Sequence, residues 1–224
     1  TVLVEKPHRK LNGIIIDDVE GGYMATSYLI SKGHKRIAFL GDTDLPEYSI
    51  HPVTLRLKGY RNALKDSGLI VPESFVRLSP YSQDQTRKVA LELLSLSEPP
   101  TSIFAATDFQ ALGVLKAARQ IGIKVPEDLA VIGFDDLDMA EYADLTTISQ
   151  HLDESGRKSV EILIAQLKTS TTLPFQRTSP LCFGSNPRAA NPAATPSASR
   201  RMAAIEVFTS ARRISSGTRT TAPK

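Results

Sequence analysis

Hydrophobic and polar positions follow two alternating periods from the start of the chain to about residue 168. Short apolar runs typical of buried β-strands are separated by longer segments in which apolar side chains recur at helical spacing. The predicted strands are 13–16, 36–40, 74–78, 101–106 and 129–134, and the predicted helices are 20–32, 54–67, 83–94, 107–121 and 153–168. Strands that alternate with helices in this way build βαβ units, so the pattern predicts an α/β fold with an open parallel sheet.

Turn residues support the ends of these helices. Gly33, Gly68 and Gly122 each follow a predicted helix, at the position where a left-handed residue commonly ends one. Thr107 and Asp108 stand at the start of the fourth helix and can cap its first turn. These turn and capping residues therefore mark where the predicted helices begin and end.

The periodic pattern ends after about Thr169, and the charge balance changes near Pro174. Eight of the 27 Lys and Arg residues lie in 175–224 with one of the 24 acidic residues, which leaves 19 basic and 23 acidic residues before them. The segment 175–224 is rich in Ala, Ser, Thr and Pro and has neither interleaved aromatic residues nor a helical face. These features disfavour a nucleic-acid-binding arm. We therefore predict a domain over 1–174 and a disordered basic tail over 175–224.

The composition offers no support for a membrane, disulfide or metal-binding protein. No apolar run approaches the roughly 20 residues that a membrane-spanning helix needs, so we expect no membrane partner. The single cysteine, Cys182, cannot form an internal disulfide and lacks the partners of a zinc site. We expect a cytoplasmic chain that holds no metal or cofactor.

Polar side chains follow several predicted strands at the point where each strand ends. In an open parallel sheet, ligands bind beyond the carboxyl ends of the strands. The polar residues at these positions are Asp42, Tyr81, Thr107, Asp108, Asp135 and Asp136. We expect several of them to converge on one cleft.

Three interpretations of the carboxylates remain open from the residues alone. Asp135 and Asp136 are consecutive, so in an extended chain their side chains point to opposite sides and do not form a dyad. A hydrolytic pair or a magnesium site would need Asp108 beside Asp135, although no phosphate-binding glycine loop accompanies them. The third interpretation is structural, with Asp108 and Asp136 capping helices or binding backbone amides. Asp135 is the best candidate for contact with a ligand.

Arg56 and Tyr81 each allow a functional and an ordinary interpretation. Arg56 lies at the start of a predicted helix, where its paired donors can hold hydroxyls or a carboxylate, or can be solvated. Tyr81 can stack on a ligand or can be an ordinary loop aromatic. The chain has no nucleophile elbow, phosphate loop or dinucleotide-binding loop, and its four histidines are isolated from one another. These observations disfavour an enzyme.

Four stretches of the chain, taken in order, resemble one family. They are "DDVEGGYMATSYLISKGHKRIAFLG", "RLKGYRNALKDSGL", "IFAATDFQALGVLKAARQIGIKVPEDLAVIGFDD" and "LTTISQ". The resemblance is to the effector-binding domain of the lactose-repressor (LacI/GalR) transcription regulators, and it covers residues 2 to about 167. It implies the fold of the periplasmic binding proteins, with mainly the C-terminal lobe and part of the N-terminal lobe in this chain.

The resemblance also implies roles for individual residues. Arg56 matches the arginine that grips effector hydroxyls or a carboxylate, and Asp135 matches the aspartate that accepts hydrogen bonds from sugar hydroxyls. Tyr81 falls where members place an aromatic beside the ligand, and Thr107 stands where many members have an asparagine. Glu5 falls near an acidic position of the other lobe. These are binding roles, and no chemistry on the ligand is implied.

For the whole protein, the resemblance implies a dimeric transcription regulator, usually a repressor. A small-molecule effector, a sugar or a similar compound, would change its affinity for operator DNA. Members begin with a helix-turn-helix headpiece that binds the operator, and we expect this N-terminally truncated chain to lack it. The alternative function is a periplasmic sugar-binding protein of an uptake transporter, and a sugar-active hydrolase ranks third.

Overall fold

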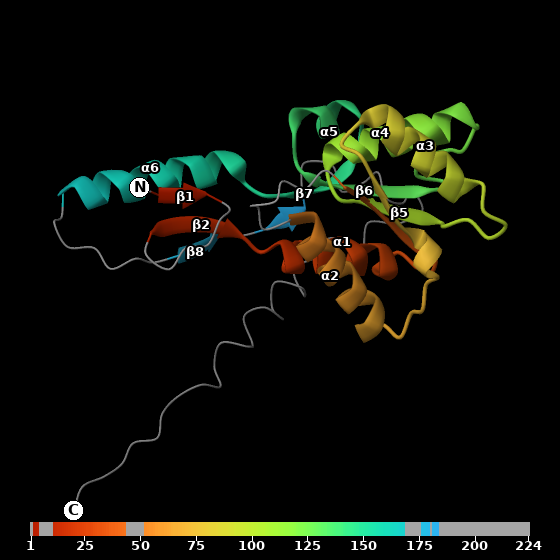
Figure 1. Ribbon diagram of the computed structural model, residues 1–224, viewed down its shortest axis with the longest axis horizontal. Helices are drawn as coiled ribbons and strands as arrows, with labels where there is room; N and C mark the ends of the chain where they lie inside the picture. The colour runs from red at the N-terminus through yellow and green to blue at the C-terminus, as the bar shows by residue number, and fades with distance from the viewer. Residues whose placement is uncertain (1, 5–10, 44–51, 169–175, 180, 184–224) are drawn as a thin grey trace, which may run out of the picture. The chain divides into compact units, whose positions relative to one another are not determined.

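The computed structural model describes residues 2–4, 11–43, 52–168, 176–179 and 181–183, to which the fold and the site are confined (Figure 1). The chain divides into a unit of Thr1–Asn191 and a unit of Pro192–Lys224, and the described elements lie in the first. They form one sheet of six strands and one of three. None of the helices in these ranges combines the length and the apolar character needed to cross a membrane.

The larger sheet contains five parallel strands and one antiparallel edge strand. Its strands are β3 (Ile37–Asp42), β4 (Val76–Ser79), β5 (Ser102–Ala105), β6 (Ala130–Asp135), β7 (Thr146–Ser149) and β9 (Cys182–Phe183). Their order is β4-β3-β5-β6-β7-β9, with β9 antiparallel to β7. Every residue of β3, β5 and β7 is buried, as expected of strands covered on both faces. The predicted α/β fold with an open parallel sheet is confirmed.

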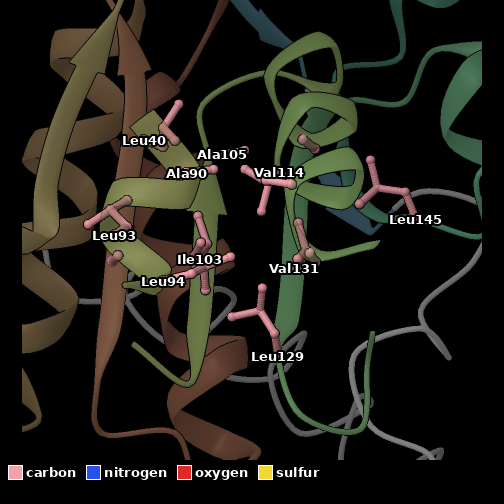
Figure 2. Close-up of a cluster of buried hydrophobic side chains, with 14 of the residues drawn as sticks. Leu40, Ala90, Leu93, Leu94, Ile103, Ala105, Val114, Leu129, Val131 and Leu145 are labelled. Carbon is pink, nitrogen blue, oxygen red and sulfur yellow. The ribbon is translucent and has the colours of Figure 1, made fainter. Parts of the chain in front are cut away.

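Helices pack against both faces of this sheet. They are α1 (Asp18–Ser31), α2 (Pro52–Asp66), α3 (Gln83–Leu94), α4 (Asp108–Gln120) and the short α5 (Asp138–Tyr142). Successive side chains of a strand point to opposite faces, so Phe39 packs among residues of α1 and α2, whereas Leu40 packs among residues of α3 and α4. Figure 2 shows the layer of α3 and α4, where Ile103 and Val131 from the sheet lie near Leu93 and Val114. Two apolar layers therefore hold the sheet, one on each face.

The smaller sheet consists of β1 (Val2–Val4), β2 (Asn12–Ile16) and β8 (Gln176–Ser179), all parallel, in the order β1-β2-β8. Helix α6 (Leu152–Lys168) contacts β1 and β2. The chain passes between elements of the two sheets three times, from β2 to α1, from β7 to α6 and from β8 to β9. This connectivity agrees with the predicted part of a second lobe.

Helices α1 and α2 approach each other so closely that glycines are required at their contact. A Cβ atom at Gly59 would lie 2.0 Å from the carbonyl oxygen of Val19, and one at Gly22 would lie 2.1 Å from the carbonyl oxygen of Arg56. Such distances exclude any side chain unless a helix moves. The backbone of Arg56 is therefore fixed directly against α1.

Several short elements were missing from the prediction. Strand β7 was not predicted because its sequence TTIS holds a single apolar residue, and helix α5 was not predicted because its five residues make little more than one helical turn. The first strand after α2 was expected at 74–78, but a 3₁₀ turn occupies Glu73–Phe75 and β4 begins at Val76. Strands β8 and β9 pair with β2 and β7, so sheet pairing continues beyond residue 174, where we expected the domain to end. The predicted character of the tail from residue 184 onward lies outside the described residues and stays a prediction.

Candidate functional site

The candidate site lies at the carboxyl end of the larger sheet, where the strand order changes direction. From β3 the chain adds β4 on one side and then β5, β6 and β7 on the other, which places the switch point between β3 and β5. Ligands of open α/β sheets bind outside the strand ends at such a point. Ala106 follows β5, Asp135 ends β6, and Arg56 of α2 contacts both.

Arg56 is the centre of this site. Its Nε donates to Oδ1 of Asp18 at 2.8 Å, and one terminal nitrogen donates to the carbonyl oxygen of Ala106 at 2.6 Å. The same nitrogen lies 3.4 Å from Oδ1 of Asp135. The guanidinium carbon stands 3.7 Å from the centroid of the Phe134 ring, within range of a cation–π contact. With only 6% of its side chain exposed, Arg56 is not the solvated helix arginine of the ordinary interpretation.

The carboxylate of Asp18 is the main structural partner of Arg56. Asp18 is the first residue of α1 and is itself buried. Burial raises the pKa of Asp18, and the charge of Arg56 only partly opposes this effect. Loss of Arg56 would leave the buried carboxylate of Asp18 without its counter-charge, and loss of Asp18 would leave Arg56 with the longer 3.4 Å contact to Asp135.

Asp135 and Asp136 have different contacts, although the chain here is not in the extended conformation that the prediction assumed. Asp135 faces Arg56 and also accepts a hydrogen bond from Nε2 of Gln150, while 16% of its side chain remains exposed. The amide of Asp136 instead donates to Asp108. Both residues have positive φ angles, 124° for Asp135 and 62° for Asp136, so the chain turns sharply as it leaves β6.

Asp108 is occupied by hydrogen bonds within the protein. Its carboxylate accepts from the hydroxyl of Thr147 at 2.5 Å and from the amide of Leu137 at 2.8 Å. This arrangement corresponds to the structural interpretation, in which Asp108 binds backbone amides. Within the part of the chain that the structure describes, no group of three or more His, Cys, Asp or Glu side chains is arranged to hold a metal ion.

Tyr81 forms an aromatic pair beside these carboxylates. Its ring stacks on that of Phe109, with centroids 4.5 Å apart and planes inclined by 16°. Burial raises the pKa of Tyr81, and the charges of Asp135 and Asp42 raise it further, so both carboxylates lie near the phenol. Because 53% of Tyr81 is exposed, a ligand can reach this residue from solvent.

The other two predicted ligand residues are placed less favourably. The hydroxyl of Thr107 accepts from the amide of Gln110 at 3.2 Å and so caps helix α4. The predicted contact of Thr107 with a ligand therefore competes with this capping bond. Glu5 lies outside the described residues, and its role stays a prediction.

The sequence did not identify four residues that contribute to the site. These are Asp18, Phe109, Phe134 and Gln150. Phe109 and Phe134 adjoin residues that were singled out, so their neighbourhood was a usable signal. Asp18 and Gln150 lie within two of the stretches that resemble the family, but their contacts with Arg56 and Asp135 arise only through the tertiary fold.

The sequence matches the family of the periplasmic binding protein-like domain over residues 26–188. Among curated proteins, it is 36% identical over 165 residues to the transcriptional repressor CytR of Escherichia coli K12, covering 72% of this chain and 47% of that protein. It is 39% identical over 160 residues to the ribose operon repressor of the same organism, covering 70% and 47%. The chain thus spans about half the length of the curated relatives it matches.

Solved structures show the same similarity. The transcriptional regulator CelR in complex with cellobiose is 30% identical, with a TM-score of 0.72 over 82% of this chain and 57% of that one. A LacI family regulator from Enterococcus faecium with bound ribose is 28% identical, with a TM-score of 0.71 over 82% of this chain and 68% of that one. Both of these similar proteins were captured with a sugar.

Proposed function

Because this chain belongs to the LacI family of transcriptional regulators, as part of its periplasmic binding protein-like effector-binding domain, we propose that it binds an uncharged sugar at the carboxyl end of the larger sheet. Arg56 and Asp135 would hold the hydroxyls of the sugar, and Tyr81 would stack on its ring. The chain is a regulator domain and not an enzyme.

The observation that carries this proposal is the buried contact of Arg56 with Asp135 at the topological switch point. An ionised carboxylate accepts hydrogen bonds and a guanidinium donates them, so the two together match hydroxyl groups, which do both. Asp18 and Asp135 both contact Arg56, and the charges of Asp135 and Asp42 act on Tyr81, so three carboxylates accompany the guanidinium of Arg56 at this site. This balance favours a neutral ligand over a phosphorylated one.

For the whole protein we propose a cytoplasmic, dimeric transcription regulator whose operator is bound by a part other than this domain. Effector binding would favour one of two conformations that differ in operator affinity. The supporting observation is that the similar curated proteins are transcriptional repressors. Neither CytR nor the ribose operon repressor is a transport-associated sugar-binding protein.

Isothermal titration calorimetry on the 224-residue chain tests ligand binding. The first ligands are D-ribose and cellobiose, which similar proteins bind, followed by nucleobases and by D-ribose 5-phosphate. We expect a neutral sugar to bind and the phosphorylated sugar to bind more weakly. Asp135→Asn should lower the affinity for the sugar by about 10- to 100-fold, because a hydrogen bond to a charged group contributes about 1.5–3 kcal/mol.

Asp128→Asn is the matched control for this experiment. Asp128 is exposed and accepts the amide of Lys124 at 3.0 Å, outside the site, so its substitution should leave sugar affinity unchanged. A sugar that binds Asp135→Asn as well as the wild-type chain would refute the proposed site.

A further inference from the structure

Asp108 connects three elements beside the candidate site. It is the first residue of α4, and its side chain is fully buried. One carboxylate oxygen accepts the amide of Leu137 at 2.8 Å, and the other accepts the hydroxyl of Thr147 on β7 at 2.5 Å. The amide of Asp136 donates to the same carboxylate. Asp108 thus links α4, the turn after β6, and β7.

The turn that Asp108 binds has a backbone conformation that side chains disfavour. The φ angles of Asp135 and Asp136, 124° and 62°, lie in the region that glycine adopts most easily. A residue with a side chain persists there only where the surrounding contacts hold it. The amide hydrogen bonds to Asp108 begin at the residue directly after Asp135 and are contacts of this kind.

Strand β6 leaves space for the Asp108 carboxylate. A Cβ atom at Gly133 would lie 2.3 Å from Oδ1 of Asp108, which is too close for any side chain. In the stretch from Gly133 to Asp136, the glycine leaves room for the Asp108 carboxylate, and the backbone amide of Asp136 donates to that carboxylate. Between them, the Phe134 ring and the Asp135 carboxylate both contact Arg56. This gives a physical reason for Gly133, Phe134 and Asp135.

We propose that Asp108 is a positioning residue for the effector: by accepting the amides of Asp136 and Leu137, it fixes the turn that presents Asp135 to the ligand. The proposal rests on the ligand-binding role proposed above for Asp135. What the turn needs from Asp108 is an acceptor rather than a charge. An asparagine can therefore replace it, with its oxygen toward the amides and its nitrogen donating to the Thr147 hydroxyl.

NMR of the ligand-free chain tests the hydrogen bonds themselves. Burial raises the pKa of Asp108 to about 6, the hydrogen bonds from Thr147 and Leu137 oppose this rise, and Asp136 is the charged group that faces the carboxylate. The amide resonances of Asp136 and Leu137 should titrate together with a midpoint of about 6. This titration should vanish in Asp108→Asn. In Thr147→Val the midpoint should move to higher pH, because the lost donor no longer stabilises the ionised form.

The same Asp128→Asn control should leave the titration of these two amides unchanged. If the Asp136 and Leu137 amides show no titration that is lost in Asp108→Asn, the proposal is overturned.

Calorimetry with D-ribose as the probe tests the consequence for binding. At a temperature where circular dichroism shows all variants folded, Asp108→Asn should bind within about threefold of the wild-type chain, and Asp108→Ala should bind at least about tenfold more weakly, because it leaves the amides unsatisfied. Wild-type affinity in Asp108→Ala, or equal losses in both variants, would overturn the proposal. If D-ribose binds neither the wild-type chain nor any variant, the proposed ligand is wrong, and the amide titrations alone decide the role of Asp108.

Discussion

Arg56 places a permanent positive charge in a buried position, where its contribution to stability depends on its two carboxylate partners. The side chains of Arg56, Asp18 and Asp135 are 6%, 10% and 16% exposed, so water screens their interaction little. Replacement of the guanidinium would leave both carboxylates without their counter-charge. The same residue therefore serves the stability of the fold as well as the candidate site.

We predict that Arg56→Met lowers the free energy of unfolding by about 3–5 kcal/mol at pH 7.5, the usual cost of breaking a buried ion pair. The cost should be smaller at pH 5. Burial already raises the pKa of Asp18 in the folded state, and loss of Arg56 raises it further. A carboxyl group with a raised folded-state pKa contributes stability at low pH and loses it as the pH rises through that pKa.

Urea denaturation of the Arg56→Met variant at the two pH values measures this difference. Arg61→Met is the control from the same helix, because Arg61 pairs with Glu73 at 2.9 Å on the exposed surface. Its effect should stay within about 0.5 kcal/mol at both pH values. A cost of Arg56→Met that is independent of pH would contradict the role assigned to Asp18.

Helix α2 is the element that delivers Arg56 to the site, and its contact with α1 fixes its position. The glycine at position 59 allows the two backbones to touch, with a virtual Cβ only 2.0 Å from the carbonyl oxygen of Val19. Asp18, the partner of Arg56, lies on the other helix of this pair. The separation of the two helices therefore sets the geometry of the ion pair.

We predict that Gly59→Ala lowers the free energy of unfolding by about 1–3 kcal/mol, the usual cost of overpacking, and weakens sugar binding as well. The extra methyl group must push α2 away from α1 and displace Arg56 with it. Gly156→Ala in α6 is the control, since Gly156 is exposed and a Cβ there meets no atom within 4 Å. That change should stabilise the chain by about 0.5–1 kcal/mol. Thermal and chemical denaturation measure the stability of the two variants. If both substitutions destabilise the chain, or both stabilise it, this account is contradicted.

At the scale of the whole molecule, the proposed function requires that effector and operator affect each other equally. If the effector changes operator affinity by some factor, the operator must change effector affinity by the same factor, commonly about 5- to 150-fold. For the whole regulator we expect a change within this range. Fluorescence anisotropy with an operator selected from random duplexes, at one fixed salt concentration, measures both affinities. An operator affinity that does not respond to a bound sugar would contradict the regulatory role.

The sequence by itself determined the fold class and most of the elements, because the periods of strands and helices are local properties of the chain. The five strand predictions and five helix predictions each correspond to an observed element, and the sheet is parallel as their alternation predicted. It also singled out Arg56 and Asp135, which the structure brings to within 3.4 Å of each other. Three short elements were missed: β7, because its sequence TTIS holds a single apolar residue, β9, because it has two residues, and α5, because its five residues make little more than one helical turn.

Only the tertiary structure decided which of these side chains are buried and what they contact. Arg56 meets Asp18 from 38 residues earlier and Asp135 from 79 residues later, and no local pattern encodes such pairs. The different contacts of Asp135 and Asp108 likewise depend on the sharp turn after β6. The turn directs the Asp135 carboxylate to Arg56, while the Asp108 carboxylate binds backbone amides. Periodicity fixes which face of an element is apolar, whereas the pairing of buried charges depends on how those faces are packed together.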